Sequence, residues 1–178
     1  MMLSKDTIGV VIVTFRRSKQ LEKTLVAIRN QGILANKIWV INNDKSEDLG
    51  YLTRKEDLAE INLVNTEENI ASAGGFAKGM NLIVQRGLNW IWLFNDDSRP
   101  VNGSLESILT HKEILEDSKT GIVKIANLNL RGEAILQNWS GRRVPSYVPV
   151  SNELKETDLV TFDGCLISTS LVKEIGTC

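Results

Sequence analysis

The sequence has 178 residues, of which 42% are hydrophobic and 24% are charged, as in an average globular domain. This composition excludes a disordered, collagen-like or disulfide-scaffold protein, and the length suffices to bury a core. With 21 basic and 22 acidic residues the net charge is −1, so we expect no nucleic-acid partner, which would need a concentrated basic surface. Only two cysteines, no signal-peptide pattern and no apolar run of membrane-spanning length predict a cytoplasmic location.

Short apolar runs alternate with helical patterns over the first two thirds of the chain. We expect strands at residues 8–13, 38–41, 61–64 and 90–94. The helical patterns are, in order, a helix capped by Ser18 that stops at Gly32, a polar segment at 48–58, a helix that follows a pair of glycines and ends near Gly87, and a helix at 105–116 capped by Ser104. These units predict an α/β fold with an open, mostly parallel sheet flanked by helices on both faces.

The alternation ends near Thr120. For the remainder we expect strands at 122–125, 134–136 and 159–167, a loop at 142–157 and a short helix at 170–175 that ends at Gly176. The last of these strands is interrupted at Asp163 and Gly164.

Polar residues follow three of the four early strands. The clusters are Thr14-Phe15-Arg16-Arg17, Asn42-Asn43-Asp44 and Asn95-Asp96-Asp97-Ser98. In parallel α/β sheets, ligands bind beyond the carboxyl ends of the strands, so we expect the clusters to converge on one edge of the sheet. This convergence points to a binding site more strongly than any one cluster does.

The acidic cluster has two adjacent carboxylates, which repel each other unless a cation or a donor lies beside them. Alternation along a strand predicts that Asn95 and Asp97 point together while Asp96 points away. Hard oxygen ligands of this kind suit Mg²⁺ or Mn²⁺, which leaves Asp96 to accept hydrogen bonds from sugar hydroxyls. The alternative is a polar turn after a strand.

Two further features have a functional and a structural interpretation. Gly74 and Gly75 precede a predicted helix. In the functional interpretation, backbone N–H groups at the start of this helix bind an anion. In the structural interpretation, the two glycines only allow the start of the helix to pack closely on its neighbours. Arg16 and Arg17 are able to hold a phosphate, or they form a solvated turn.

Taken in chain order, five segments resemble the family 2 glycosyltransferases of the GT-A fold. They are VVIVTFRR, WVINNDKSED, NIASAGGFAKGMN, WIWLFNDDSRP and TFDGCLISTSLVKEIG. The third is similar to a glycine-rich stretch of the rhamnosyl- and galactofuranosyltransferase branch. The fourth resembles the strand that carries the Asp-x-Asp motif of the family.

The resemblance implies a function and a set of site residues. The function is inverting transfer of a sugar from a UDP- or dTDP-linked donor to a saccharide or lipid-linked acceptor, in cell-surface polysaccharide synthesis at the inner face of the membrane. Asn95 and Asp97 would hold Mg²⁺ or Mn²⁺. The donor-binding residues implied are Thr14, Phe15, Arg16, Asn42, Asn43, Asp44, Asn69, Gly74, Gly75, Lys78 and Asp96.

Three positions depart from the family pattern. Asn42 stands in place of an Asp, Asn95 in place of the first Asp of the metal motif, and Arg16 in place of an Asn. The family places its general base in an acidic segment after the helix that corresponds to 170–175, which we expect to lie beyond Cys178. Within the chain, Asp163 is the candidate base.

We therefore expect one GT-A domain over 1–178, with a donor part at about 1–100, an acceptor part at about 101–178, and an incomplete active site. The alternative is a truncated, catalytically inactive module that binds a nucleotide sugar. The sequence disfavours a sugar nucleotidyltransferase, a response regulator and a dinucleotide dehydrogenase, because the turn after the first strand has neither glycines nor acidic residues.

Overall fold

The computed structural model describes residues 4–117, 119–125, 127–128, 134–136, 146–148 and 160–177. The strands are β1 (Ile8–Thr14), β2 (Ile38–Asn42), β3 (Asn62–Asn65), β4 (Trp90–Asn95), β5 (Ile122–Lys124), β6 (Asn127–Leu128), β7 (Ala134–Leu136), β8 (Ser146–Val148) and β9 (Cys165–Ser168). The α-helices are α1 (Ser18–Arg29), α2 (Ala71–Gln85), α3 (Ser104–Leu109), α4 (Lys112–Glu116) and α5 (Thr169–Ile175). Short 3-10 helices occur at Lys5–Thr7, Ala35–Lys37, Gly50–Arg54 and Glu56–Leu58.

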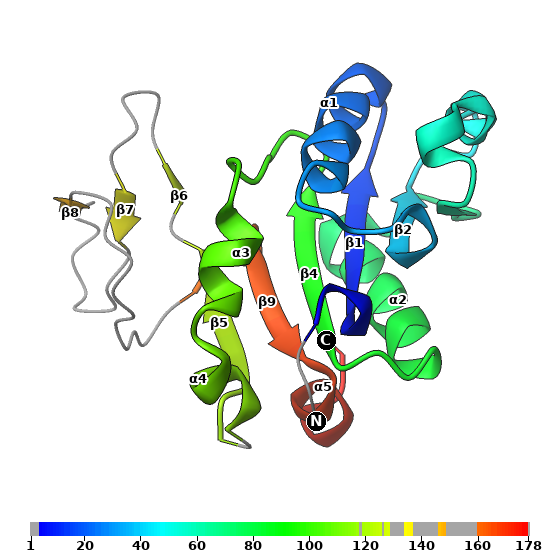
Figure 1. Cartoon of the computed structure of the whole chain (residues 1–178). Helices are drawn as coiled ribbons and strands as arrows, with labels where there is room; N and C mark the ends of the chain where they lie inside the picture. Colours follow the sequence, from blue (N-terminus) through cyan, green and yellow to red (C-terminus); the bar gives the residue numbers. More distant parts are fainter. Residues whose placement is uncertain are drawn as a thin grey trace.

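Six strands form one twisted sheet in the order β3-β2-β1-β4-β9-β5 (Figure 1). The four early strands are parallel, as the apolar runs of β1, β2 and β4 predict, while β9 pairs antiparallel with both β4 and β5. The strands β6, β7 and β8 form a separate antiparallel sheet of three strands. The predicted α/β class with a mostly parallel sheet is confirmed.

Helices cover both faces of the large sheet (Figure 1). On one face, side chains of α1, α3 and α4 form a hydrophobic core together with Ile8, Val10 and Ile12 of β1. On the other face, side chains of α2 and α5 form a second core together with Val11 and Val13 of the same strand. Every residue of β1 is buried, so the strand lies between two hydrophobic cores and holds its carboxyl end in a fixed place.

Glycines bring α2 unusually close to β1. A Cβ atom at Gly75 would lie 2.7 Å from Val13 Cγ1, and one at Gly79 would overlap both methyl groups of Val11. One turn further on, the relation reverses, since Ile83 of α2 packs over Gly9 of β1. At these three positions a glycine of one element faces a larger side chain of the other, so α2 packs closely against β1.

Two predicted helices are wrong in their extent. The predicted helix at 105–116 is two helices, because the Thr110 hydroxyl bonds to the Ser107 carbonyl at 2.6 Å and the chain turns at His111. The residues at 48–58 form two 3-10 helices in place of one helix, beginning after a turn in which the Asp48 carboxylate accepts the Gly50 N–H at 2.7 Å.

Helix starts and the last strand also differ from the prediction. The N-cap positions of α1 and α3 are Arg17 and Gly103, with Ser18 and Ser104 as the first helical residues. The predicted strand at 159–167 is paired only over Cys165–Ser168. Ser146–Val148 is a strand inside the predicted loop at 142–157, and the rest of that loop lies outside the described residues.

Candidate functional site

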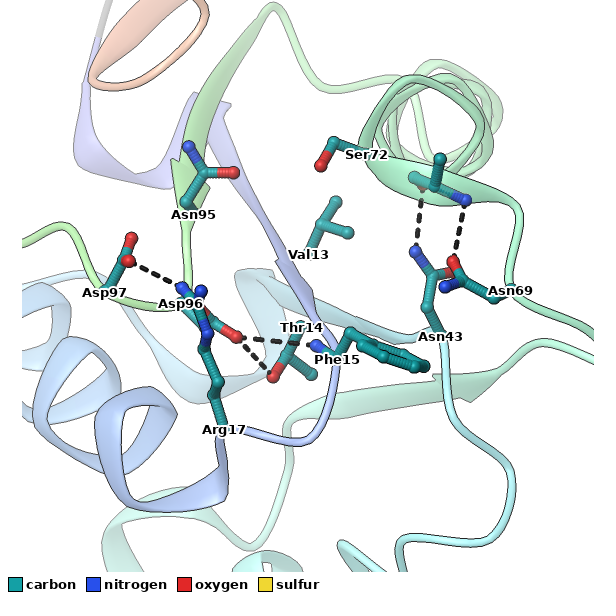
Figure 2. Close-up of a pocket in the computed structure, with 11 residues that line it drawn as sticks. Val13, Thr14, Phe15, Arg17, Asn43, Asn69, Ser72, Asn95, Asp96 and Asp97 are labelled. Atoms are coloured by element: carbon teal, nitrogen blue, oxygen red, sulfur yellow. Dashed lines mark hydrogen bonds and ion pairs between the residues drawn. The ribbon is translucent and has the colours of Figure 1, made fainter.

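A polar cavity of about 430 Å³ lies beyond the carboxyl ends of β1 and β4, beside the start of α2 (Figure 2). Its lining comes from four separate segments of the chain and consists of Val13, Thr14, Phe15, Arg17, Asn43, Asn69, Ala71, Ser72, Asn95, Asp96 and Asp97. The parallel register of β1 with β2 and β4 brings these segments to one edge of the sheet. The predicted convergence of the three polar clusters is therefore present in the fold.

Asp96 joins the ends of β4 and β1. Its side chain is almost wholly buried, and its Oδ2 accepts the Thr14 hydroxyl at 2.8 Å and the Phe15 N–H at 3.4 Å. Its carbonyl oxygen accepts the Thr24 hydroxyl from α1 at 2.7 Å. Burial raises the pKa of Asp96, and the hydrogen bonds from Thr14 and Phe15 oppose that rise without cancelling it.

Arg17 supplies the cation that two adjacent carboxylates need. Its Nη1 lies 2.6 Å from Asp97 Oδ2 and 3.5 Å from Asp96 Oδ1 (Figure 2). The prediction that Asp96 points away from Asp97 is wrong in this respect, because β4 ends at Asn95 and the turn that follows brings both carboxylates to one guanidinium. Arg17 is not among the donor-binding residues that the family resemblance implies, although the pair Arg16-Arg17 was a candidate phosphate site in the sequence.

Arg16 and Asp44 form a second ion pair next to the cavity. Arg16 Nε lies 2.5 Å from Asp44 Oδ2, and Asp44 Oδ1 accepts the Ser46 hydroxyl at 2.6 Å and its N–H at 2.9 Å. These bonds from Ser46 and Arg16 lower the pKa of Asp44 to about 2. Arg16 has a left-handed backbone (φ 57°) and its guanidinium lies 4.9 Å from the centre of the Phe15 ring.

Asn42 and Asn43 have different positions. The Asn42 amide donates to the Glu47 carbonyl and to Asn65 Oδ1, both at 3.0 Å, and accepts the Asp44 N–H, so this side chain builds the turn after β2. The neighbouring Asn43 lines the cavity and donates to the Ala71 carbonyl at 2.9 Å. Of the predicted cluster at 42–44, Asn43 is thus the member that faces the cavity.

The glycine-rich segment is part of a helix. Asn69 lines the cavity and its Oδ1 accepts the Ala71 N–H at 2.9 Å, where α2 begins (Figure 2). The prediction that the glycine pair precedes the helix is wrong, since Gly74 and Gly75 lie within its first turns and pack on neighbouring side chains. They are not among the cavity-lining residues, and Lys78 is exposed.

The acidic turn offers two oxygen ligands to a divalent cation, from Asn95 and Asp97. Among the described residues, no three His, Cys, Asp or Glu side chains come together as a metal cluster. Mg²⁺, however, is commonly held by one or two carboxylates with substrate phosphates as the remaining ligands. Asp97 is half exposed at the cavity and Asn95 lies beside it, so this donor set fits an ion that arrives with a diphosphate.

Asp163 reaches the same turn from the segment before β9. Its Oδ1 accepts the Asn95 N–H at 3.0 Å and its Oδ2 accepts the Ser98 hydroxyl. The candidate base therefore lies beside the acidic turn, with both carboxylate oxygens hydrogen-bonded. The family resemblance implies that Asp163 lies near the site, but nothing in the sequence indicates these two partners.

The architecture is the GT-A fold of glycosyltransferases. Superposition on Staphylococcus aureus TarS (residues 1–349) gives a TM-score of 0.60 over 94% of this chain and 48% of that chain, at 14% identity. A second structure of that fragment, in complex with UDP-GlcNAc, gives a TM-score of 0.61 at 13% identity. At these identities the likeness concerns the fold alone.

The proteins with similar sequences are galactofuranosyltransferases. The chain is 25% identical over 183 residues to the galactofuranosyltransferase GlfT1 of Mycolicibacterium smegmatis, covering 98% of this chain. It is 33% identical over 94 residues to GlfT1 of Mycobacterium tuberculosis, covering 52% of this chain. The chain spans 60% and 31% of the length of these two proteins. No protein-family model matches the sequence.

Proposed function

We propose that this chain is a glycosyltransferase domain that binds a nucleotide-diphospho-sugar in the cavity and transfers the sugar, with inversion, to a saccharide or lipid-linked acceptor. The observation that carries the proposal is the placement of Arg17, Asp96, Asp97 and the exposed Phe15 around one cavity at the carboxyl edge of a GT-A sheet. The sequence relatives named as galactofuranosyltransferases support the same class of reaction.

The nucleotide would lie toward Phe15 and Asn43. The Phe15 ring is 39% exposed and lines the cavity, so a base has an aromatic face to stack on. Asn43 and Asn69 offer amide groups for the base or ribose, and the Arg16–Asp44 ion pair borders this side. Asn42, Gly74, Gly75 and Lys78 would act only indirectly, because none of them lines the cavity.

The diphosphate would lie over the acidic turn. Asn95 and Asp97 would hold Mg²⁺ or Mn²⁺ together with phosphate oxygens, and the ion would neutralise the charge that develops on the leaving diphosphate. In that arrangement Asp97 would bind the ion in place of Arg17, and the Arg17 guanidinium would bind a phosphate oxygen. Asp96 keeps its bonds to Thr14 and Phe15 and orients the turn.

In the transfer step an acceptor hydroxyl attacks the anomeric carbon, the bond from that carbon to the diphosphate oxygen breaks, and a carboxylate takes the hydroxyl proton. The carboxylates that line the cavity, among the described residues, are Asp96 and Asp97, and both have other roles in this scheme. A module that binds the donor without turnover is therefore the second candidate, favoured by the two hydrogen bonds that already occupy Asp163.

Location and pathway stay predictions. No helix in the described part of the chain is long and apolar enough to cross a membrane. A cytoplasmic enzyme that works at the inner face of the membrane, in cell-surface polysaccharide synthesis, is consistent with a lipid-linked acceptor.

The test of the reaction is sugar transfer by the purified chain. UDP- and dTDP-linked sugars are incubated with Mn²⁺ and a lipid-linked or oligosaccharide acceptor, and products are identified by mass spectrometry and by NMR of the anomeric proton. A product with an inverted anomeric centre supports the proposal. Nucleotide binding without product supports the second candidate. If neither nucleotide binding nor product is observed, both candidate functions are contradicted.

A further inference from the structure

We propose that Asp163 is a positioning residue that holds the acidic turn at Asn95–Asp97 in the geometry that binds the donor diphosphate; this rests on the proposed function. The carboxylate bonds to the backbone N–H of Asn95 on one side and to the Ser98 hydroxyl on the other. Asn95 and Ser98 are the residues that flank Asp96 and Asp97. A single carboxylate thus fixes both ends of the turn.

The segment that carries Asp163 is anchored to β4 independently of its carboxylate. The Gly164 N–H donates to the Leu93 carbonyl at 2.8 Å, and Trp92 Nε1 donates to the Gly164 carbonyl at 3.3 Å. Lys124 of β5 donates to the Asp163 carbonyl. Gly164 has a φ of 74°, which lets the chain turn sharply from Asp163 into β9. Removal of the carboxylate should therefore leave this segment in place and release only the turn.

The middle of the turn is held at Asp96, whose carboxylate accepts bonds from Thr14 and Phe15 and whose carbonyl accepts the Thr24 hydroxyl, but its two ends are joined more weakly. The Ser98 N–H bonds to the Asn95 carbonyl at 3.3 Å, which is long for a backbone hydrogen bond, and Asp97 is half exposed. Small displacements of a ligand group are costly where a diphosphate and an ion must be held in one geometry. The carboxylate of Asp163 adds a second anchor at the two ends of the turn, and each of its oxygens is already engaged in a hydrogen bond there.

Substitution separates this role from that of a base. In Asp163→Asn the amide oxygen still accepts the Asn95 N–H, and the amide N–H₂ is able to donate to the Ser98 hydroxyl. Asp163→Asn should therefore retain nucleotide affinity and turnover within about threefold, whereas Asp163→Ala should weaken UDP binding with Mn²⁺ by about tenfold or more. A general base would show the opposite pattern, because asparagine is unable to accept the proton and alanine would leave UDP affinity intact.

Calorimetry, hydrogen exchange and the rate of sugar transfer test the proposal on the full chain. The rate of sugar transfer is compared between the wild type and Asp163→Asn. Calorimetry of UDP with Mn²⁺ compares the wild type with the variants Asp163→Ala, Asp163→Asn and Ser98→Ala. The remote control is Asp117→Ala, which also removes a carboxylate that is hydrogen-bonded to a backbone N–H. Hydrogen exchange of the Asn95 amide is measured without ligand, where Asp163→Ala should accelerate exchange about tenfold.

The outcomes are distinct. Unchanged Asn95 exchange or unchanged UDP affinity in Asp163→Ala overturns the positioning role, and so does loss of turnover in Asp163→Asn with intact affinity. If the wild type binds neither UDP nor dTDP, the proposed function fails and the donor-positioning role fails with it. In that case accelerated Asn95 exchange would still identify the hydrogen bond as a structural one.

Discussion

Arg17 Nη1 lies 2.6 Å from Asp97 Oδ2, so the half-exposed carboxylate at the centre of the candidate metal motif is already paired with a cation from the chain itself. The same nitrogen lies 3.5 Å from the buried Asp96. Arg17 therefore offsets part of the negative charge of the acidic turn, and a divalent ion would have to compete with this side chain for Asp97.

Replacement of Arg17 tests that competition. Arg17→Gln should tighten Mn²⁺ binding to the nucleotide-free chain by up to about fivefold, since an exposed ion pair contributes about 1 kcal/mol or less. The affinity for UDP with Mn²⁺ should fall at the same time, because a phosphate contact is lost. Electron paramagnetic resonance of free Mn²⁺ measures the first effect, with Arg86→Gln as a remote control. Unchanged or weaker Mn²⁺ binding would contradict the competition.

The ionisation of Asp44 should make the free energy of unfolding depend on pH. Its folded-state pKa is lowered from 3.8 to about 2 by hydrogen bonds from Ser46 and by Arg16. A lowered pKa contributes stability above the ordinary value, and this contribution disappears as the pH falls through the folded value. The free energy of unfolding of the wild type should exceed that of Asp44→Asn above pH 4, with the gap closing toward pH 2.

Urea unfolding of both variants between pH 2 and 7 measures this gap, with Asp117→Asn as the control that removes one exposed carboxylate. A gap that stays constant across the whole range would mean that the Arg16–Asp44 pair and the Ser46 bonds do not stabilise the folded chain in solution.

The contact of α2 with β1 predicts that an added methyl group destabilises the fold. In Gly79→Ala the better helix propensity of alanine contributes about 1 kcal/mol, but overlap with Val11 costs about 1 to 3 kcal/mol. The net effect on the urea midpoint should be destabilising, and the double variant with Val11→Ala should recover part of the loss. A stabilised Gly79→Ala would show that the helix stands further from the strand.

Phe15 should govern nucleotide affinity through its ring. Phe15→Ala removes an exposed aromatic face at the cavity and should weaken UDP binding about tenfold, as stacking of a base on an aromatic side chain is worth about 1 to 3 kcal/mol. Ile175→Ala, a truncation of an exposed apolar side chain on α5, serves as the control for surface effects. Equal affinities for Phe15→Ala and the wild type would remove Phe15 from the nucleotide site.

Much of the fold could be predicted from the sequence because its signals are local. The strands β1, β2 and β4 have long apolar runs, and their burial on both faces follows from that pattern, whereas β3 is a partly exposed edge strand. The start of α2 was placed too late because glycines disfavour a helix, whereas the close packing of Gly75 and Gly79 on β1 offsets that cost.

The candidate site was predictable only in outline. Strand ends located Thr14, Asn43 and the acidic turn, because topology alone brings them together. The bonds from Asp163 to Asn95 and Ser98 cross more than sixty residues of sequence, and no local pattern specifies such a contact. The direction of a side chain in a turn, as at Asp97, depends on backbone geometry after the strand has ended.

The central claim is that the acidic turn binds the diphosphate of a nucleotide sugar together with a divalent ion. The direct test is a calorimetric titration of UDP, with and without Mn²⁺, into the wild type, Asp97→Ala and the remote control Asp117→Ala. We predict Mn²⁺-dependent binding by the wild type and the control, and at least about tenfold weaker binding by Asp97→Ala. Equal affinity in Asp97→Ala, or binding that is independent of Mn²⁺, would contradict the claim.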